Sequence, residues 1–297
     1  MPQSITYGVE IECSIPSFGS SPQDRIASDL RALGIRATST SYSGRDYSVW
    51  QIKPDCSLRP STGHQGTAEI VSPVLTWGSD EHDAQLRTVS EYLVSIGAKT
   101  NASCGGHVHI YVGHLTAPQL ATFVESYHFN QRAIDPLVSS SRRGSGANYC
   151  QRRSDNYVSQ ALGYLRDPQH GTDAATYVGG HGTMINADWY PDRGTFEMRQ
   201  RQASVNHYKI TGWVGFLVGL IRAAEADVEL RDEAQDTEDL LSAMVLGDFI
   251  TPVLRDWVLG SVPRVNTLPQ IVERLTVVRA AASQRVSRLM RLQGIAV

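Results

Sequence analysis

The sequence predicts an α+β fold, in which an antiparallel sheet packs one face against helices and leaves the other, polar face open. Three observations predict this fold. Residues 4–15 alternate between apolar and polar side chains, several later segments repeat that alternation, and helical patterns lie between and after them. Of the 297 residues, 41% are hydrophobic and 19% are charged, so the chain can bury a sizeable core.

Alternation with a period of two predicts the strands, and the first segment is the clearest. In residues 4–15 the odd positions from Ile5 to Ile15 are apolar, whereas the even positions are polar or glycine and include Glu10 and Glu12. Strands are expected at 4–15, 48–53, 67–75, 107–112, 183–188 and 195–201. A turn is expected at 190–194, and residues 139–153, rich in Ser, Gly and Arg, are expected to form a long loop.

Apolar residues at helical spacing predict the helices. They are expected at 22–33, 81–96, 118–131, 206–226, 237–246 and 268–292. Ser21 and Gly34 suit the start and the end of the first helix. Because helices alternate with strands early and dominate late, we expect one domain over 1–227 and a helical C-terminal extension over 228–297 packed on it.

Composition and charge argue against several classes of protein. The net charge is -3, so neither nucleic acid nor an anionic membrane is expected as a partner. The apolar stretch at 212–221 is about half of what a membrane span needs, and the N-terminal residues lack the layout of a signal peptide. The four cysteines are far apart and form no CxxC pair, which favours reduced thiols and a cytoplasmic location.

Ionisable residues recur on the polar faces of the predicted strands. Glu10 and Glu12 share one face, His107 and His109 share another, and Glu197 and Arg199 share a third. Glu69 and Lys53 lie on two further strands, and Asp55 begins the turn that follows Lys53. Each pattern alone also fits a solvated strand face, a surface histidine pair or a salt bridge.

The combination points to metal chemistry. If these strands share a sheet, one face carries Glu10, Glu12, Glu69, His107, His109 and Glu197 together. Four carboxylates in a cleft need cations, and oxygen ligands with one imidazole suit Mg²⁺ or Mn²⁺ better than zinc. Arg199 and Lys53 would remain as cations suited to a phosphate or a developing oxyanion. This polar face is therefore the expected active site, equipped for phosphoryl transfer.

Six motifs also resemble those of a known family. They are YGVEIE at 7–12, WQIKPDCSL at 50–58, AEIVSPVL at 68–75, NASCGGHVHI at 101–110, SRRGSGANYC at 141–150 and GTFEMRQR at 194–201. Together, and in this order, they resemble the putative amidoligase family of carboxylate–amine ligases, which share the glutamine synthetase fold with glutamate–cysteine ligases. The resemblance implies that fold for residues 1–227, and ATP-dependent formation of an amide through an acyl phosphate.

The resemblance also implies roles for individual residues. Glu10, His107 and Glu197 would hold the metal nearest the γ-phosphate of ATP, and Glu12 and Glu69 would hold a second metal on the substrate side. His109 would face the nucleotide phosphates, Arg199 the acyl-phosphate oxygens, and Lys53 and Asp55 would serve catalysis. The loop residues expected to close over nucleotide or substrate are Arg142, Arg143, Asn148 and Tyr149. A solvated loop is the alternative for that segment.

Other functions remain open at this stage. A metal-dependent hydrolase could use His107 and His109 with the carboxylates, and His114 superficially extends that set. A binding protein that keeps the fold without catalysis is a third possibility. For the ligase, the partners would be a small-molecule or peptide carboxylate and an amine, and neither compound is identified by the sequence. The oligomeric state is open as well.

Overall fold

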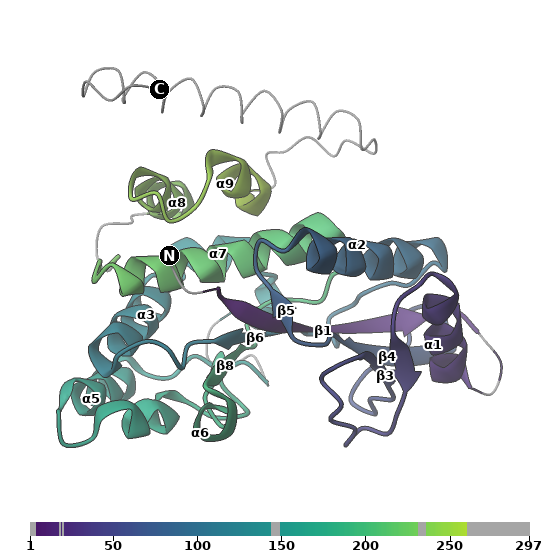
Figure 1. The fold of residues 1–297 in the computed structure, drawn as a ribbon, viewed down its shortest axis with the longest axis horizontal. Coiled ribbons are helices and arrows are strands. Elements are labelled where there is room, and N and C mark those ends of the chain that lie inside the picture. The colour runs from purple at the N-terminus through teal and green to yellow at the C-terminus, as the bar shows by residue number, and fades with distance from the viewer. Residues whose placement is uncertain (1–3, 18, 20, 144–148, 231–235, 260–297) are drawn as a thin grey trace.

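The computed structural model describes residues 4–17, 19, 21–143, 149–230 and 236–259 (Figure 1). One eight-stranded sheet has the order β2-β3-β4-β1-β6-β8-β7, with β5 pairing with β1. Its strands are β1 (Thr6–Ile15), β2 (Ala37–Ser39), β3 (Trp50–Lys53), β4 (Gly66–Val71), β5 (Leu75–Thr76), β6 (Gly106–Tyr111), β7 (Ile185–Asn186) and β8 (Thr195–Met198). The predicted α+β class is confirmed, because helices cover a mostly antiparallel sheet.

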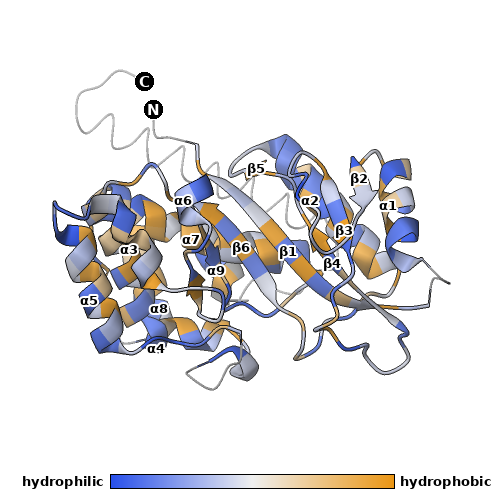
Figure 2. Ribbon diagram, turned by 90° about the horizontal axis from the view of Figure 1, so that it is seen from below, coloured by the Kyte–Doolittle hydropathy of each residue, from blue (hydrophilic) through white to orange (hydrophobic). Residues whose placement is uncertain are grey.

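The register of the sheet aligns the ionisable residues in rows across the strands. Glu12 of β1 lies opposite Glu69 of β4, which lies opposite Lys53 of β3. Glu10 of β1 lies opposite His107 of β6, and two residues along β6, His109 lies opposite Glu197 of β8. The prediction that these strands share one sheet is confirmed. Figure 2 shows the resulting alternation of hydrophilic and hydrophobic residues along β1 and β6.

The helices and short 3₁₀ turns are more numerous than predicted. They are α1 (Pro22–Ala32), α2 (Asp80–Ser95), α3 (Ala117–Phe129), α4 (Gln131–Ile134), η1 (Asp135–Leu137), η2 (Ser140–Arg142), α5 (Asp155–Arg166), η3 (Gly171–Val178), α6 (Tyr190–Arg193), α7 (His207–Glu225), α8 (Thr237–Leu246) and α9 (Pro252–Leu259). The predicted helix at 268–292 lies outside the described residues.

Several expectations need correction. The sheet contains one parallel pair, β2 with β3, and β2 itself was not predicted. The expected turn at 190–194 is the short helix α6, which ends at Gly194 with a φ of 63°, a left-handed conformation that glycine adopts without strain. The expected strand at 183–188 is paired only at Ile185–Asn186. The segment expected as a long loop contains the 3₁₀ turn η2.

Helix α7 forms the centre of the helical layer on the apolar side of the sheet (Figure 1). Its side chains are buried on nearly every face, because α2 and α3 contact it within the fold and α8 and α9 pack on its outer side. Gly215 and Gly219 permit this packing, since a Cβ on Gly215 would overlap with Leu254 and one on Gly219 with Met244 and Ile250. None of the helices in the described part of the chain is long and apolar enough to cross a membrane.

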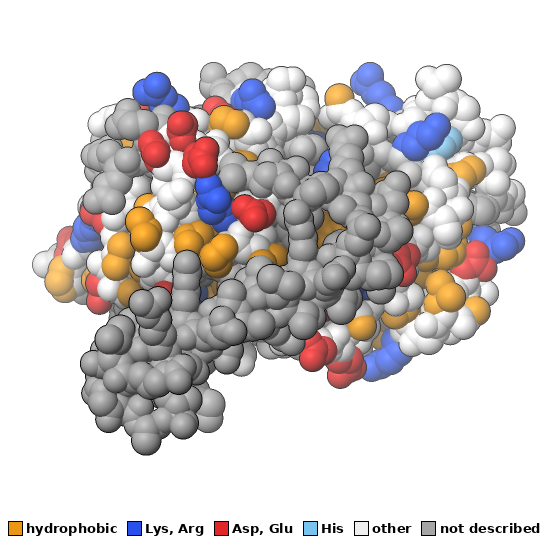
Figure 3. Space-filling view, turned by 90° about the horizontal axis from the view of Figure 1, so that it is seen from above, with side chains coloured by type: hydrophobic (Ala, Val, Ile, Leu, Met, Phe, Trp, Pro, Cys, Tyr) orange, Lys and Arg blue, Asp and Glu red, His pale blue; other side chains and the backbone are white. Residues whose placement is uncertain are grey.

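The two sides of the molecule differ in character. Seen from the helix-covered side, acidic, basic and hydrophobic side chains are interspersed among the described residues (Figure 3). On the opposite side, the polar faces of the central strands remain uncovered by helices (Figure 2). A functional site is therefore expected on the open face of the sheet.

Candidate active site

The open face of the sheet forms the floor of a large cleft. The cleft has a volume of about 1990 Å³. Its floor carries Glu10, Glu12, Glu69, His107 and His109, and its walls come from loops at both edges of the sheet. Lys53, Asp55, Arg142, Tyr149, Glu197 and Arg199 line it as well. The structure thus brings most of the residues singled out in the sequence into one place.

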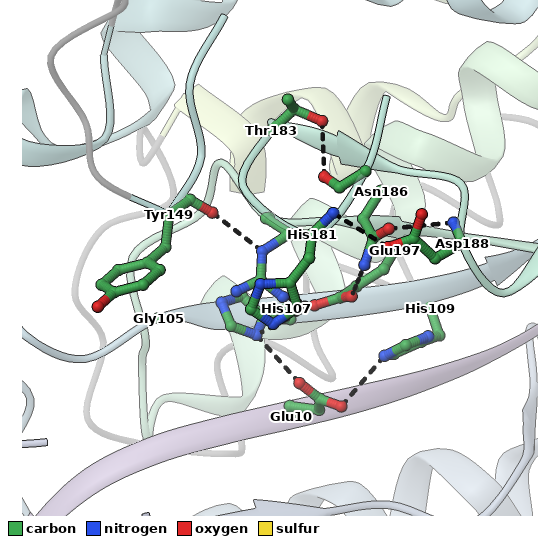
Figure 4. Close-up of polar contacts among 12 residues, drawn as sticks. Glu10, Gly105, His107, His109, Tyr149, His181, Thr183, Asn186, Asp188 and Glu197 are labelled. Atoms are coloured by element: carbon green, nitrogen blue, oxygen red, sulfur yellow. Dashed lines mark hydrogen bonds and ion pairs between the residues drawn. The ribbon is translucent and has the colours of Figure 1, made fainter. Parts of the chain in front are cut away.

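Glu10 lies between the two imidazoles of β6 (Figure 4). Its Oε2 is 3.0 Å from Nδ1 of His107, and its Oε1 is 3.1 Å from Nε2 of His109. Burial alone would raise the pKa of Glu10, but the charge of His109 and the hydrogen bonds from both imidazoles hold it well below its usual value. Burial would lower the pKa of His109, yet the charge and hydrogen bond of Glu10 raise it. The two groups therefore stabilise each other's charged forms.

Three side chains of this cluster could share one metal ion. Ligand atoms of Glu10, His109 and Glu197 all lie within 4.8 Å of one another. The resemblance had implied His107 in this set, with His109 facing the phosphates. His107 lies deeper, at 5% exposure, with its Nδ1 3.4 Å from Glu197 and 3.8 Å from Glu12. The geometry therefore favours His109 as the imidazole of the set, with His107 directly beside it.

The imidazole of His107 lies so close to the backbone of Gly105 that this position has no room for a side chain. Its Nε2 is buried and has no hydrogen-bond partner among the described residues. A Cβ on Gly105 would overlap with that nitrogen and would lie 3.2 Å from Nη1 of Arg142. The backbone N–H of Gly105 donates to the carboxylate of Glu12. This glycine thus permits the close approach of three side chains to the backbone.

Glu12 and Glu69 form a second acidic pair beside the first. They lie opposite each other in the register of β1 and β4, and both are buried. Burial, reinforced by the charge of Glu10, raises the pKa of Glu69 to about 9. Burial also raises the pKa of Glu12, against the charge of His107 and the hydrogen bond from Gly105. Without a cation, Glu69 is therefore protonated at neutral pH, and a divalent ion that replaced the proton would restore its charge.

Glu197 is oriented by partners on two sides. Nδ2 of Asn186 donates to its Oε2 at 2.7 Å, and Nη1 of Arg199 pairs with its Oε1. Nε of Arg199 donates to the backbone carbonyl of Tyr149 at 2.9 Å. The same-strand salt bridge between Glu197 and Arg199 is therefore present within the cleft. Asn186 was not singled out in the sequence, because its position opposite Glu197 depends on the pairing of β7 with β8.

Two buried cations line the cleft beside the pair of Glu12 and Glu69. Lys53 and Arg142 are each 8% exposed. Neither side chain makes a hydrogen bond or an ion pair with any of the described residues. The charge of Lys53 acts on Glu69 and that of Arg142 acts on Glu12, but neither cation has a hydrogen-bonded anion, so both are suited to an anionic ligand.

The remaining predicted residues differ in their placement. Asp55 lines the cleft, and its carboxylate accepts a hydrogen bond from the backbone N–H of Ser57 at 2.7 Å. Tyr149 is exposed at the rim. Arg143 is directed elsewhere, since its guanidinium donates to the carbonyl of Val138, so this arrangement does not support its expected contact with nucleotide or substrate. Asn148 lies outside the described residues.

His114 does not join the cleft histidines. Its Nε2 is 2.8 Å from a carboxylate oxygen of Glu225, at the end of α7. A hydrolase that used His114 with the other two histidines is therefore not favoured. Sequence reasoning missed a different group of cleft residues, which lie in loops and at the two ends of the short helix α6: Tyr42, Arg45, Tyr47, Arg59, Trp189 and Arg193. No periodic pattern in the sequence indicates them, because their position at the cleft depends on how the whole chain folds.

Comparison with known proteins places the chain in a family. Residues 3–221 match the model of a family described as putative amidoligase enzyme. The match begins ahead of β1, ends inside α7 and includes every strand described above. The comparison with curated proteins yields no match. A member of such a family is an enzyme of the ligase type. Since the match spans the whole sheet with its acidic and histidine-bearing face, the chain belongs to the amidoligase family.

Proposed function

We propose that the protein is an ATP- and Mg²⁺-dependent carboxylate–amine ligase that forms an amide or isopeptide bond through an acyl phosphate. One observation carries the proposal. Glu10, His109 and Glu197 converge within 4.8 Å, directly beside the buried pair of Glu12 and Glu69. Two adjoining acidic clusters of this kind suit two divalent cations, and the glutamine synthetase-like fold that the sequence motifs imply is part of the proposal.

The donor set fits Mg²⁺ or Mn²⁺. Glu10, Glu197 and one imidazole would hold one ion, and Glu12 and Glu69 would hold the other, with His107 between the two groups. Carboxylate oxygens dominate both sets, which is the preference of hard cations. Bound there, the ions would draw charge from the transferring phosphoryl group.

The protein's own side chains would position the reactants. A carboxylate oxygen of the acid attacks the γ-phosphorus of ATP, and ADP leaves with the electrons of the broken P–O bond. Arg199, held by Glu197 and the carbonyl of Tyr149, would contact the oxygens of the resulting acyl phosphate. The amine nitrogen then attacks the acyl carbon, and inorganic phosphate leaves. Asp55, at the cleft wall, is suited to accept the proton that the amine loses.

Lys53 and Arg142 are suited to the acid. Both are buried and unpaired among the described residues, and they lie at the Glu12 side of the cleft. A carboxylate would supply the anionic partner that each cation lacks. We therefore assign this end of the cleft to the acyl substrate, whereas the resemblance alone left Arg142 to close over either nucleotide or substrate.

The size of the cleft supports a reaction with three substrates. A pocket for one small molecule typically has a volume of about 300–1,000 Å³. The cleft, at about 1990 Å³, has room for a nucleotide, an acid and an amine together.

The test is an assay for ADP and phosphate. The protein is incubated with ATP, Mg²⁺ and pools of amino acids, peptides and polyamines, and ADP release is measured with and without each amine. Amine-dependent ADP release that stops in Glu197→Ala, without loss of folding, supports the proposal. Hydrolysis of an amide without ATP, together with no ADP release for any pool, would favour the metal-dependent hydrolase instead.

A further inference from the structure

Four residues at one end of the cleft form an arginine–aromatic bridge, which consists of Arg45, Tyr47, Trp189 and Arg193. The guanidinium carbon of Arg45 lies 5.0 Å from the centroid of the Trp189 ring. That of Arg193 lies 4.1 Å from the ring of Tyr47 and 5.2 Å from the ring of Trp189. Two guanidinium groups thus converge on one indole ring, and such contacts hold a cation over an aromatic face.

The bridge joins opposite walls of the cleft. Arg45 and Tyr47 belong to the loop between β2 and β3, at one edge of the sheet, whereas Trp189 and Arg193 flank and end α6 beside β7 and β8, at the other edge. Figure 2 shows α6 and β3 on opposite sides of β1 and β6. The contacts between Arg45 and Trp189 and between Arg193 and Tyr47 therefore cross the open face of the sheet.

The two arginines keep their charge available for a ligand. Many arginines of the protein pair with carboxylates, as Arg199 does with Glu197 and Arg166 with Glu125. Within the described residues, neither Arg45 nor Arg193 forms an ion pair, and both side chains are exposed at the cleft. Aromatic rings orient them without neutralising them. A pair of oriented, unneutralised guanidinium groups is suited to phosphate oxygens, which they can bind through paired N–H donors.

The bridge lies next to the proposed metal ligands. The ring centroid of Trp189 is 6.5 Å from that of His109, whose Nε2 contacts Glu10. Two further cations of the cleft, Lys53 and Arg142, form no ion pair among the described residues and lie towards Glu69 and Glu12. Positive charge therefore flanks the acidic clusters at two separate ends of the cleft, and the end near His109 carries the aromatic rings.

We propose that the arginine–aromatic bridge binds the phosphates of the nucleoside triphosphate, with Arg45 and Arg193 as the contacting residues. The inference rests on the proposed function, since it names the subsite for the nucleotide of that reaction. It adds to the roles that the sequence motifs imply, in which His109 faces the nucleotide phosphates and a loop with Arg142, Arg143, Asn148 and Tyr149 closes over nucleotide or substrate. Binding here would join both edges of the sheet through one ligand.

The experiment measures equilibrium binding to the full-length protein in the presence of Mg²⁺. The probes are ATP, inorganic triphosphate and adenosine, and the variants are Arg45→Gln and Arg193→Gln. Each variant should bind ATP and triphosphate roughly tenfold more weakly, as expected for the loss of a charged hydrogen-bond donor, and should bind adenosine as the wild type does. Arg153→Gln is the matched control, because Arg153 lies 4.8 Å from the ring of Tyr157 in a similar contact outside the cleft lining.

Two results would overturn the inference. One is unchanged affinity for ATP and triphosphate in both folded variants, and the other is an equal loss for adenosine, which would indicate recognition of the base. If the wild type binds ATP and these variants bind it equally well, the inference fails while the proposed function stands. If the wild type binds no ATP in the presence of Mg²⁺, the proposed function fails with it.

Tryptophan fluorescence provides an independent readout. Trp189→Phe keeps an aromatic ring under the two arginines but removes the indole that reports on them. ATP should change the fluorescence of the wild type, and most of that change should disappear in Trp189→Phe although ATP still binds. A change that persists in full would show that the nucleotide binds away from the bridge.

Discussion

Glu12 and Glu69 lie directly opposite each other on β1 and β4, and the two carboxylates are buried on the floor of the same cleft. Two adjacent buried acids cannot both be ionised without a cation. In this protein Glu69 is the acid that retains its proton, because burial and the charge of Glu10 raise its pKa to about 9.

The first prediction concerns pH and magnesium. Glu69 has a pKa in the metal-free folded state above its unfolded value, so it contributes stability below the unfolded pKa that is lost as the pH rises towards 9. Mg²⁺ must displace its proton, so binding should strengthen over the same pH range. The increase in melting temperature caused by Mg²⁺ should therefore be larger at pH 8.5 than at pH 6.5. Glu69→Gln should remove most of that pH dependence, and an unchanged dependence in this variant would contradict the assignment.

The second prediction concerns the ion pair at the centre of the cleft. Glu10→Gln removes the charge that raises the pKa of His109, so burial should then dominate and this pKa should fall. An NMR titration of the metal-free protein would follow the imidazole signals directly. Glu91→Gln, on the exposed face of α2, is the control and should leave the titration of His109 unchanged. An equal effect of both variants would indicate that overall charge, not the contact with Glu10, sets the pKa.

The third prediction concerns Gly105. Gly105→Ala places a Cβ against Nε2 of His107 and near Arg142, so the ring must shift. We expect a stability cost of about 1–3 kcal/mol and a loss of roughly a hundredfold in kcat, measured by chemical denaturation and by ADP release. Gly163→Ala is the matched control, because nothing lies near its added Cβ on the exposed side of α5. It should stabilise the protein by about 0.5–1 kcal/mol and leave kcat as it is.

The fourth prediction separates the two ends of the cleft. Arg142→Gln should raise KM for the acid roughly tenfold and leave KM for ATP unchanged, because Arg142 lies at the Glu12 end. Steady-state kinetics with the acid and ATP varied in turn would measure both constants. Arg132→Gln, an exposed arginine of α4, should change neither. A rise in KM for ATP alone would show that Arg142 contacts the nucleotide, which is the other role that the sequence motifs leave open.

Much of this site could be predicted from the sequence because strand alternation is local information. The alternation in residues 4–15 fixes which side chains share a face, and Glu10 and Glu12 do project together into the cleft. The rows across strands depend on register, which the sequence does not display. His109 therefore joins Glu10 and Glu197 in the structure, whereas the motifs favoured His107.

Tertiary contacts account for the other differences. His114 and Arg143 are close in sequence to residues that line the cleft. The side chain of His114 pairs instead with Glu225, and that of Arg143 donates to the carbonyl of Val138. β2 has three residues and depends on β3 for its hydrogen bonds, so no local pattern reveals it. α5 is different, since Val158, Leu162 and Leu165 have helical spacing after the N-cap Ser154, and this helix could have been predicted.

The two glycines of α7 determine where the segment beyond the family match packs. The family match ends at residue 221, inside α7, and the surface notched by Gly215 and Gly219 receives the segment that follows it. The inner side of the helix meets the layer that supports the cleft, and its outer side meets α8 and α9. α8 and α9 thus pack on this layer through α7 and α4 without lining the cleft, so we expect substitutions in these two helices to alter stability and leave the cleft lining unchanged.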